Sequence, residues 1–115
     1  MKLEIMTTKE YREKKEDSVQ KKRLQDSMER GRNCKAELFS GCIVGTFAIP
    51  DKTDLFHKKQ VLGYYLDQEE FLLVSDQKMK SDFRKEVESE SFDSMETPPQ
   101  FLAGFIEYLI KEDIL

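Results

Sequence analysis

Residues 60–75 read QVLGYYLDQEEFLLVS, and this segment decides the fold class. Two apolar runs, 61–66 and 71–74, flank the four polar residues 67–70, a length that suits a hairpin loop. Neither run alternates between apolar and polar residues, so both faces of each strand are apolar. Strands of this kind lie in the middle of a sheet that is covered on both sides. The segment therefore predicts two adjacent strands, 60–66 and 70–75, with helices on both faces of their sheet.

Two further strands are predicted upstream of this hairpin. Cys34, Ala36 and Leu38 alternate with Lys35 and Glu37, the pattern of a half-buried strand over 34–39. Ser40-Gly41 interrupts it, and a second run rich in β-branched and aromatic residues follows over 43–49. Because three of the joins are short, we expect one mostly antiparallel sheet.

The N-terminal third predicts a helix. Thr7 and Glu10 stand at capping-box spacing, so a helix should start there and run toward Gly31, whose freedom at positive φ suits a helix end. Large apolar residues are sparse in it, which indicates a helix that buries only a thin stripe. Before it, residues 3–5 could form a short edge strand.

The C-terminal half predicts two more helices. Ser75-Asp76 can cap a helix through Glu88, and Thr97, Pro98 and Gln100 mark the start of the last helix. This last helix is apolar nearly all round and shows no C-cap before the chain end. One apolar stripe of this helix is enough to pack on the sheet, and the remaining apolar residues need a second surface to cover them. We therefore expect self-association through this helix.

The length of the chain fits one domain, and the predicted elements place it in the α+β class. We expect an α/β/α sandwich-like fold, with a mixed, mostly antiparallel sheet of four to five strands and helices on both faces. The chain has 115 residues, of which 37% are charged, with a net charge of −4. That balance argues against a general nucleic-acid binder. No segment approaches 18 apolar residues, and the two cysteines show no CxxC spacing, so a cytoplasmic chain is expected.

Catalytic signals are weak, and we expect no enzyme. His57 is the only histidine and stands in a charged segment beside two lysines, which favours a solvated side chain. No nucleophile–base pairing is visible. Acidic residues cluster at Asp51 and Asp54, at residues 67–70 and at 86–90. Mg²⁺ accepts such oxygen ligands, but solvated charged faces produce the same pattern.

Five segments together resemble one known family. They are CKAEL (34–38), GTFAIPDK (45–52), QVLGYYLD (60–67), FLLVSDQ (71–77) and TPPQFLAGFIEYLIKEDIL (97–115). In this order they look like the N-terminal cytosolic domain of CorA-like magnesium transporters. In that family a mixed sheet lies between helices, and the last helix continues as a stalk into two membrane helices of a pentamer.

The resemblance implies a regulatory domain without the pore, since the chain has no Gly-Met-Asn motif. Residues 1–97 would be the cytosolic α/β domain, and 98–115 the start of the stalk helix packed on it. The domain would lie on the cytoplasmic side of the membrane and meet the membrane only through a further C-terminal part. Regulatory Mg²⁺ would bind between subunits, and candidate ligands are Asp51, Asp54, Glu107, Glu112 and Asp113. The alternative is a freestanding protein-interaction (adaptor) module whose last helix docks a partner.

Overall fold

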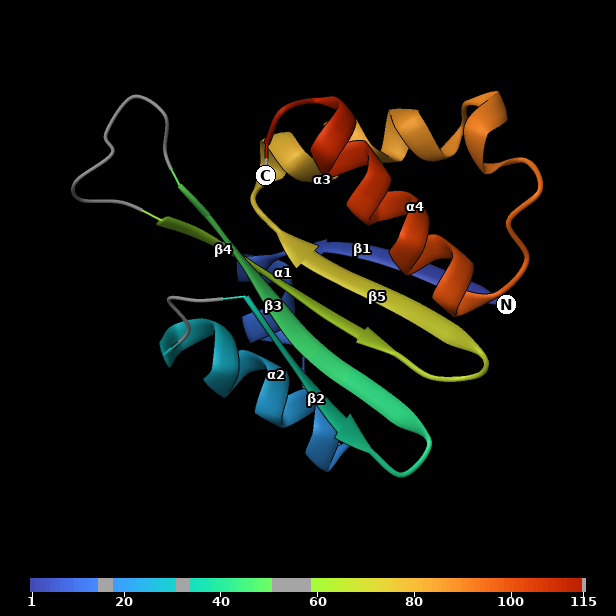
Figure 1. Cartoon of the computed structure of the whole chain (residues 1–115). Helices are drawn as coiled ribbons and strands as arrows, with labels where there is room; N and C mark the ends of the chain where they lie inside the picture. The colour runs from blue at the N-terminus through green and yellow to red at the C-terminus, as the bar shows by residue number, and fades with distance from the viewer. Residues whose placement is uncertain (15–17, 31–33, 51–58, 115) are drawn as a thin grey trace.

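The computed structural model describes residues 1–14, 18–30, 34–50 and 59–114. Five strands form a single sheet in the order β1-β5-β4-β3-β2 (Figure 1). Their bounds are β1 (Lys2–Thr7), β2 (Lys35–Phe39), β3 (Cys42–Pro50), β4 (Lys59–Leu66) and β5 (Glu70–Ser75). The four strands predicted from the sequence are all present with ends within one residue of those expected.

The sheet is mixed and mostly antiparallel, as expected. Strands β2 to β5 follow one another as antiparallel neighbours, and β1 adds to β5 in parallel. The short edge strand expected at residues 3–5 is a six-residue strand whose Ile5 lies opposite Leu73 of β5. The β4–β5 hairpin thus sits in the interior of the sheet, where its apolar residues require cover on both faces.

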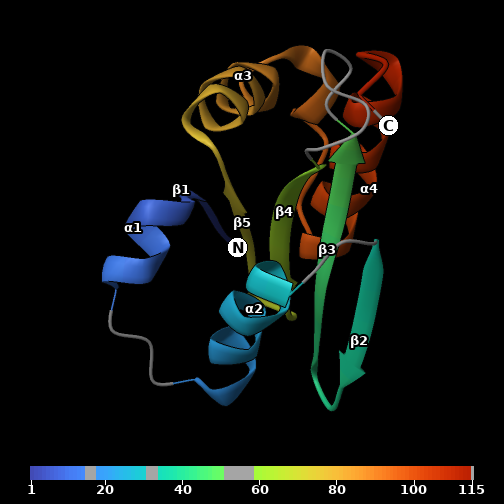
Figure 2. The ribbon, with the colours of Figure 1, turned by 90° about the vertical axis from the view of Figure 1, so that its left-hand side faces the viewer.

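Helices cover both faces of the sheet (Figure 2). On one face lie α1 (Thr8–Glu13) and α2 (Val19–Arg30), and on the other lie α3 (Gln77–Val87) and α4 (Pro98–Lys111). The α1/α2 face carries a small core of Tyr11, Leu24, Val44, Tyr65, Leu72 and Val74. The predicted α+β sandwich is therefore confirmed.

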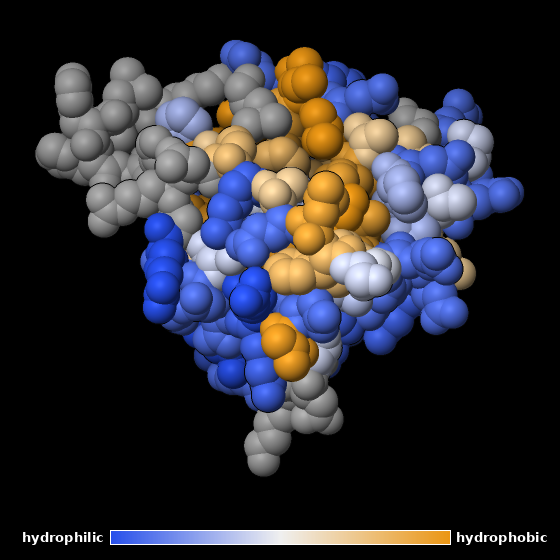
Figure 3. Space-filling model, turned by 60° about the horizontal axis from the view of Figure 1, so that its bottom comes forward, coloured by the Kyte–Doolittle hydropathy of each residue, from blue (hydrophilic) through white to orange (hydrophobic). Residues whose placement is uncertain are grey.

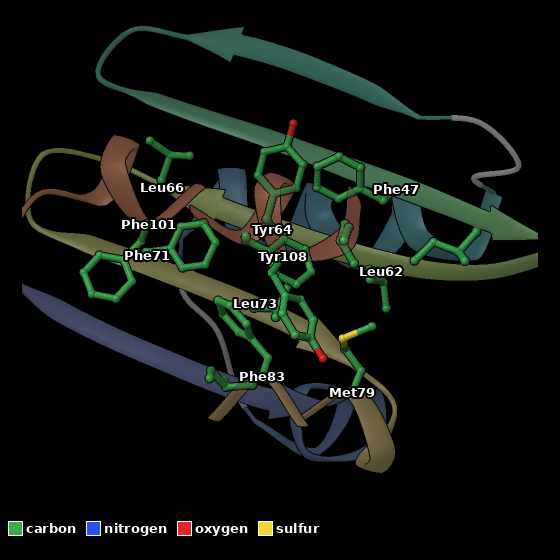
Figure 4. Packing of buried hydrophobic residues seen from close by; sticks show 14 of the residues in the cluster. Phe47, Leu62, Tyr64, Leu66, Phe71, Leu73, Met79, Phe83, Phe101 and Tyr108 are labelled. Atoms are coloured by element: carbon green, nitrogen blue, oxygen red, sulfur yellow. The ribbon is translucent and has the colours of Figure 1, made fainter. Parts of the chain in front are cut away.

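The larger core lies under α3 and α4 and is rich in aromatic rings. Phe83 is fully buried, with its ring centroid 4.7 Å from that of Phe105 and 5.5 Å from that of Tyr108. On the sheet, the Phe47 and Tyr64 rings lie side by side with centroids 5.2 Å apart (Figure 4).

No helix in the described part of the chain has the length and apolarity needed to cross a membrane.

The N-terminal helix differs from the expectation. The Thr7–Glu10 capping box forms as predicted, but α1 ends after Glu13, because Lys14 is extended. A second helix, α2, begins at Val19. The Tyr11 hydroxyl donates to the Lys21 carbonyl and so links the two helices. The break allows both Tyr11 and Leu24 to reach one sheet face, which a single straight helix would not allow. Gly31 lies outside the described residues.

The last helix starts as predicted and ends differently. Thr97 and Gln100 form the capping box, and Pro98 begins α4. The expectation of an uncapped end is wrong. Asp113 has φ +55°, the Asp113 amide donates to the Ile110 carbonyl (3.0 Å), and the Ile114 amide donates to the Leu109 carbonyl (2.8 Å). This is a Schellman motif, and Ile114 packs back against the core.

Candidate functional site

An apolar groove of about 440 Å³ lies where the β2–β3 turn, the β4–β5 turn and the start of α4 meet. These three segments are far apart in sequence and come together at one end of the sheet (Figure 1). Figure 3 shows this end of the molecule, where apolar residues form a band from the centre of the view to its upper margin, flanked by hydrophilic residues. The groove is lined by Leu38, Phe39, Gly41, Cys42, Ile43, Leu66, Asp67, Gln68, Thr97, Pro98 and Pro99.

Local sequence places each wall. Ser40-Gly41 is a two-residue turn in which Gly41 takes φ +85°, a conformation that side-chain-bearing residues rarely adopt. This tight turn projects Leu38 and Ile43 on the α4 side of the sheet. Opposite them, Pro98 is buried at the first position of α4, where its lack of an N–H costs no hydrogen bond.

An apolar stripe on α4 continues from the groove. Leu102, Ile106 and Ile110 follow Pro98 at four-residue spacing, so they share one face of the helix. Leu102 and Ile106 are half-buried at the margin of the core, and Ile110 is 62% exposed. Leu38 on β2 is 78% exposed. The groove and the stripe together form the interaction face, defined by Leu38, Ile43, Leu66, Pro98, Pro99, Leu102, Ile106 and Ile110.

The exposure of Leu38 corrects the sequence analysis. Alternation over 34–39 predicted that Cys34, Ala36 and Leu38 face a core, yet all three are exposed. They do point to the α4 side, since Leu38 is the register partner of Ile43. However, α4 packs over β5, and β2 lies three strands away at the sheet edge. No helix in the described part of the chain covers the α4 side of β2, whereas on the other side Arg23 of α2 reaches Glu37 and Phe39.

Two polar side chains at the groove margin, Asp67 and Thr97, are already engaged in hydrogen bonds. Asp67 Oδ1 accepts from the amides of Glu69 and Glu70, both at 2.8 Å, and Oδ2 accepts from the Tyr65 hydroxyl at 2.9 Å. Thr97 Oγ1 accepts from the Gln100 amide. These oxygens close a turn and cap a helix, and most of the remaining lining of the groove is apolar.

Burial and hydrogen bonding shift the pKa values of these groups. Burial, together with the hydrogen bond to Asp67, raises the pKa of Tyr65 well above its usual range. Burial and the nearby Asp67 charge raise the pKa of the Cys42 thiol. Burial acts against ionisation of Asp67, but its two amide donors and Tyr65 outweigh it and lower its pKa. All three groups thus keep their ordinary charge states at neutral pH.

A nearly buried ion pair lies behind the groove, on the α2 side. Lys21 Nζ is 2.7 Å from Glu70 Oε1, and these side chains are only 12% and 15% exposed. Lys21 also lies 5.1 Å from the centroid of the Tyr65 ring. The pair joins α2 to the start of β5. Sequence analysis missed it, because residues 49 positions apart carry no local signal of contact.

The predicted metal ligands do not gather. Asp51 and Asp54 lie outside the described residues, as does His57. Glu107, Glu112 and Asp113 are exposed on α4 and its C-terminal turn. Within the described ranges, no group of three or more His, Cys, Asp or Glu residues is placed to hold a metal ion.

The other acidic clusters have structural partners. Asp67 closes the β4–β5 turn, Glu70 pairs with Lys21, and Glu86 Oε1 lies 3.5 Å from Lys111 Nζ.

Comparison with known proteins adds no relative: no protein-family model, curated protein or solved structure matches the chain.

Proposed function

We propose that this chain acts by binding, as the cytosolic regulatory domain of a CorA-like magnesium transport protein. The observation that carries the proposal is the interaction face, an apolar surface on a chain of which 37% of the residues are charged. Contiguous apolar surface rimmed by polar residues marks interaction sites. The sequence resemblance supports the choice of family, and the mixed sheet between helices is the fold that it implies.

In this proposal the α4 stripe packs against a helix of a neighbouring subunit. Leu102, Ile106 and Ile110 repeat every four residues, the spacing with which one helix presents a ridge to another. Regulatory Mg²⁺ would bind between subunits, with Glu107, Glu112 and Asp113 as the candidates among the described residues. One chain alone would supply few direct ligands, so its own affinity for Mg²⁺ is expected to be weak.

The gene itself provides the decisive test of this assignment. Downstream of codon 115 we expect a long helical segment, then about twenty apolar residues, and Gly-Met-Asn after them. A stop codon, or an unrelated domain, at that position would contradict the transporter proposal.

A second candidate function is a freestanding adaptor module, which one observation favours. The Schellman motif turns the chain off the α4 axis at Asp113 and returns Ile114 to the core. A helix that continues as a stalk requires this turn to open, whereas an adaptor does not. In an adaptor the same interaction face would receive an amphipathic helix of a partner.

Replacement of Ile110 tests the interaction face in either setting. Ile110→Glu places a charge on the exposed stripe and should abolish partner or subunit binding while leaving the fold intact. Val19→Glu is the matched control, because it also replaces an exposed apolar residue by glutamate, but on α2 at the other face of the sheet. Equal effects of the two variants would contradict the role of the stripe.

A further inference from the structure

Strand β2 is an open edge of the sheet. It pairs with β3 on one side, and no described segment pairs with its other side. It contains no proline, and Lys35, Ala36 and Leu38 are exposed. Such an edge presents unpaired N–H and C=O groups and is a template for pairing with another strand.

The β2–β3 turn fixes which backbone groups point outward. Only two residues separate Phe39 from Cys42, so this closing pair must be a hydrogen-bonded one. Hydrogen-bonded and non-hydrogen-bonded pairs alternate along an antiparallel ladder. Glu37 and Lys35 therefore direct their backbone groups to β3, whereas those of Ala36 and Leu38 point to the free edge.

Within one copy Lys35 Nζ lies 3.0 Å from Glu37 Oε1, and in one register these two charges are also complementary between copies. If two copies pair antiparallel with Ala36 opposite Ala36, the outward backbone groups meet and each Lys35 lies opposite Glu37 of the other copy. Shifting the centre to Lys35 or to Glu37 places like charges directly opposite each other, which is unfavourable. A register shifted by one residue places the outward backbone groups of one strand opposite the inward backbone groups of the other. The hydrogen bonds between the two strands then cannot form.

We propose that β2 pairs with β2 of a second copy about a two-fold axis through Ala36, which makes a continuous ten-stranded sheet. The contact is isologous, as most homodimer contacts are. Leu38 then lies opposite Cys34 of the other copy, so part of its exposed surface is covered. Because β2 has only five residues, the dimer is weak and depends on concentration. This contact is separate from the α4 stripe.

Reciprocal charge variants test the register. Lys35→Glu leaves two acidic residues on β2, and Glu37→Lys leaves two basic ones, so each variant alone places like charges opposite each other twice. We expect each to raise the dimer dissociation constant roughly tenfold or more at low salt, measured by sedimentation equilibrium. An equimolar mixture of the two restores opposite charges at both positions and should dimerise like the parent.

Two controls accompany this experiment. Lys85→Glu and Glu88→Lys, both on the exposed surface of α3 or its cap, change the net charge equally and should leave the parent dimer unchanged. Circular dichroism checks that each β2 variant folds. A strictly monomeric parent, variants that still dimerise, or a mixture that stays monomeric each overturns the proposal. Loss of the dimer in Ile110→Glu but not in the β2 variants would assign it to the α4 stripe instead.

A cross-link provides a measurement that does not depend on charge. Residues opposite each other in a hydrogen-bonded antiparallel pair have Cα atoms about 5.5 Å apart, within the range for a disulfide. Ala36→Cys, in a background with Cys34→Ser and Cys42→Ala, should therefore form a disulfide-linked dimer under mild oxidation. Lys22→Cys, exposed on α2, should not. Equal cross-linking of both variants would contradict the pairing.

Discussion

Truncation of Phe83 should be the most costly single change in the aromatic core. The side chain is fully buried, and its ring contacts those of Phe92, Phe105 and Tyr108 at centroid distances of 5.5, 4.7 and 5.5 Å. It therefore joins α3 to α4 and to the turn η1 (Glu90–Phe92). Phe83→Ala leaves a cavity among rigid rings that cannot collapse to fill it.

The expected loss is about 3–5 kcal/mol of unfolding free energy. For 115 residues, an unfolding entropy of about 2.1 cal/mol/K per residue gives about 0.24 kcal/mol/K. The melting temperature should then fall by roughly 12–20 °C. A domain of this size has a total stability of about 6–17 kcal/mol, so the variant should still fold at 25 °C but with little margin.

Urea unfolding at 25 °C, followed by circular dichroism, measures the free energy, and a thermal scan measures the midpoint. Phe83→Leu retains most of the apolar volume and should cost less than half as much. Val19→Ala removes a side chain that is 67% exposed and should change stability by no more than about 0.5 kcal/mol. A cost below about 1 kcal/mol for Phe83→Ala, or equal costs at positions 83 and 19, would refute this account of the core.

Four further predictions address separate features. Hydrogen bonds from the Lys80 ammonium and the Thr7 amide lower the pKa of Glu10 to about 2. The contribution of this carboxylate to stability is therefore present above pH 4.5 and is lost as the pH falls toward 2. In Glu10→Gln the urea midpoint should vary less over that range. Iodoacetamide at pH 8 should alkylate exposed Cys34 before Cys42, whose pKa is raised by burial, and mass spectrometry of the peptides gives the order. At position 113, where φ is +55°, glycine should be more stable than alanine by about 1 kcal/mol in thermal unfolding. Calorimetry on the monomeric chain should show at most weak Mg²⁺ binding, and one tight, Mg²⁺-selective site would contradict the proposal of sites shared between subunits.

Local signals predicted the elements of this fold well. Apolar residues on both faces of 61–66 and 71–74 placed the β4–β5 hairpin inside the sheet, because such residues cannot remain in water on either side. The capping boxes at Thr7 and Thr97 located two helix starts, since each depends on residues only three positions apart. Of the candidate metal ligands, the structure describes Glu107, Glu112 and Asp113, and their role stays a prediction.

The sequence by itself determined the strands, the starts of α1, α3 and α4, and the need for cover on both faces of the sheet, because hydrogen-bonding caps and apolar periodicity act within a few residues. Only the tertiary structure decided that β1 joins β5 in parallel, that the first helix breaks after Glu13, and that Leu38 is exposed. Those features depend on which distant segment occupies a given face. Alternation shows that one side of β2 is apolar, but whether that side is covered depends on how far α4 extends across the sheet, which no residue near Leu38 encodes.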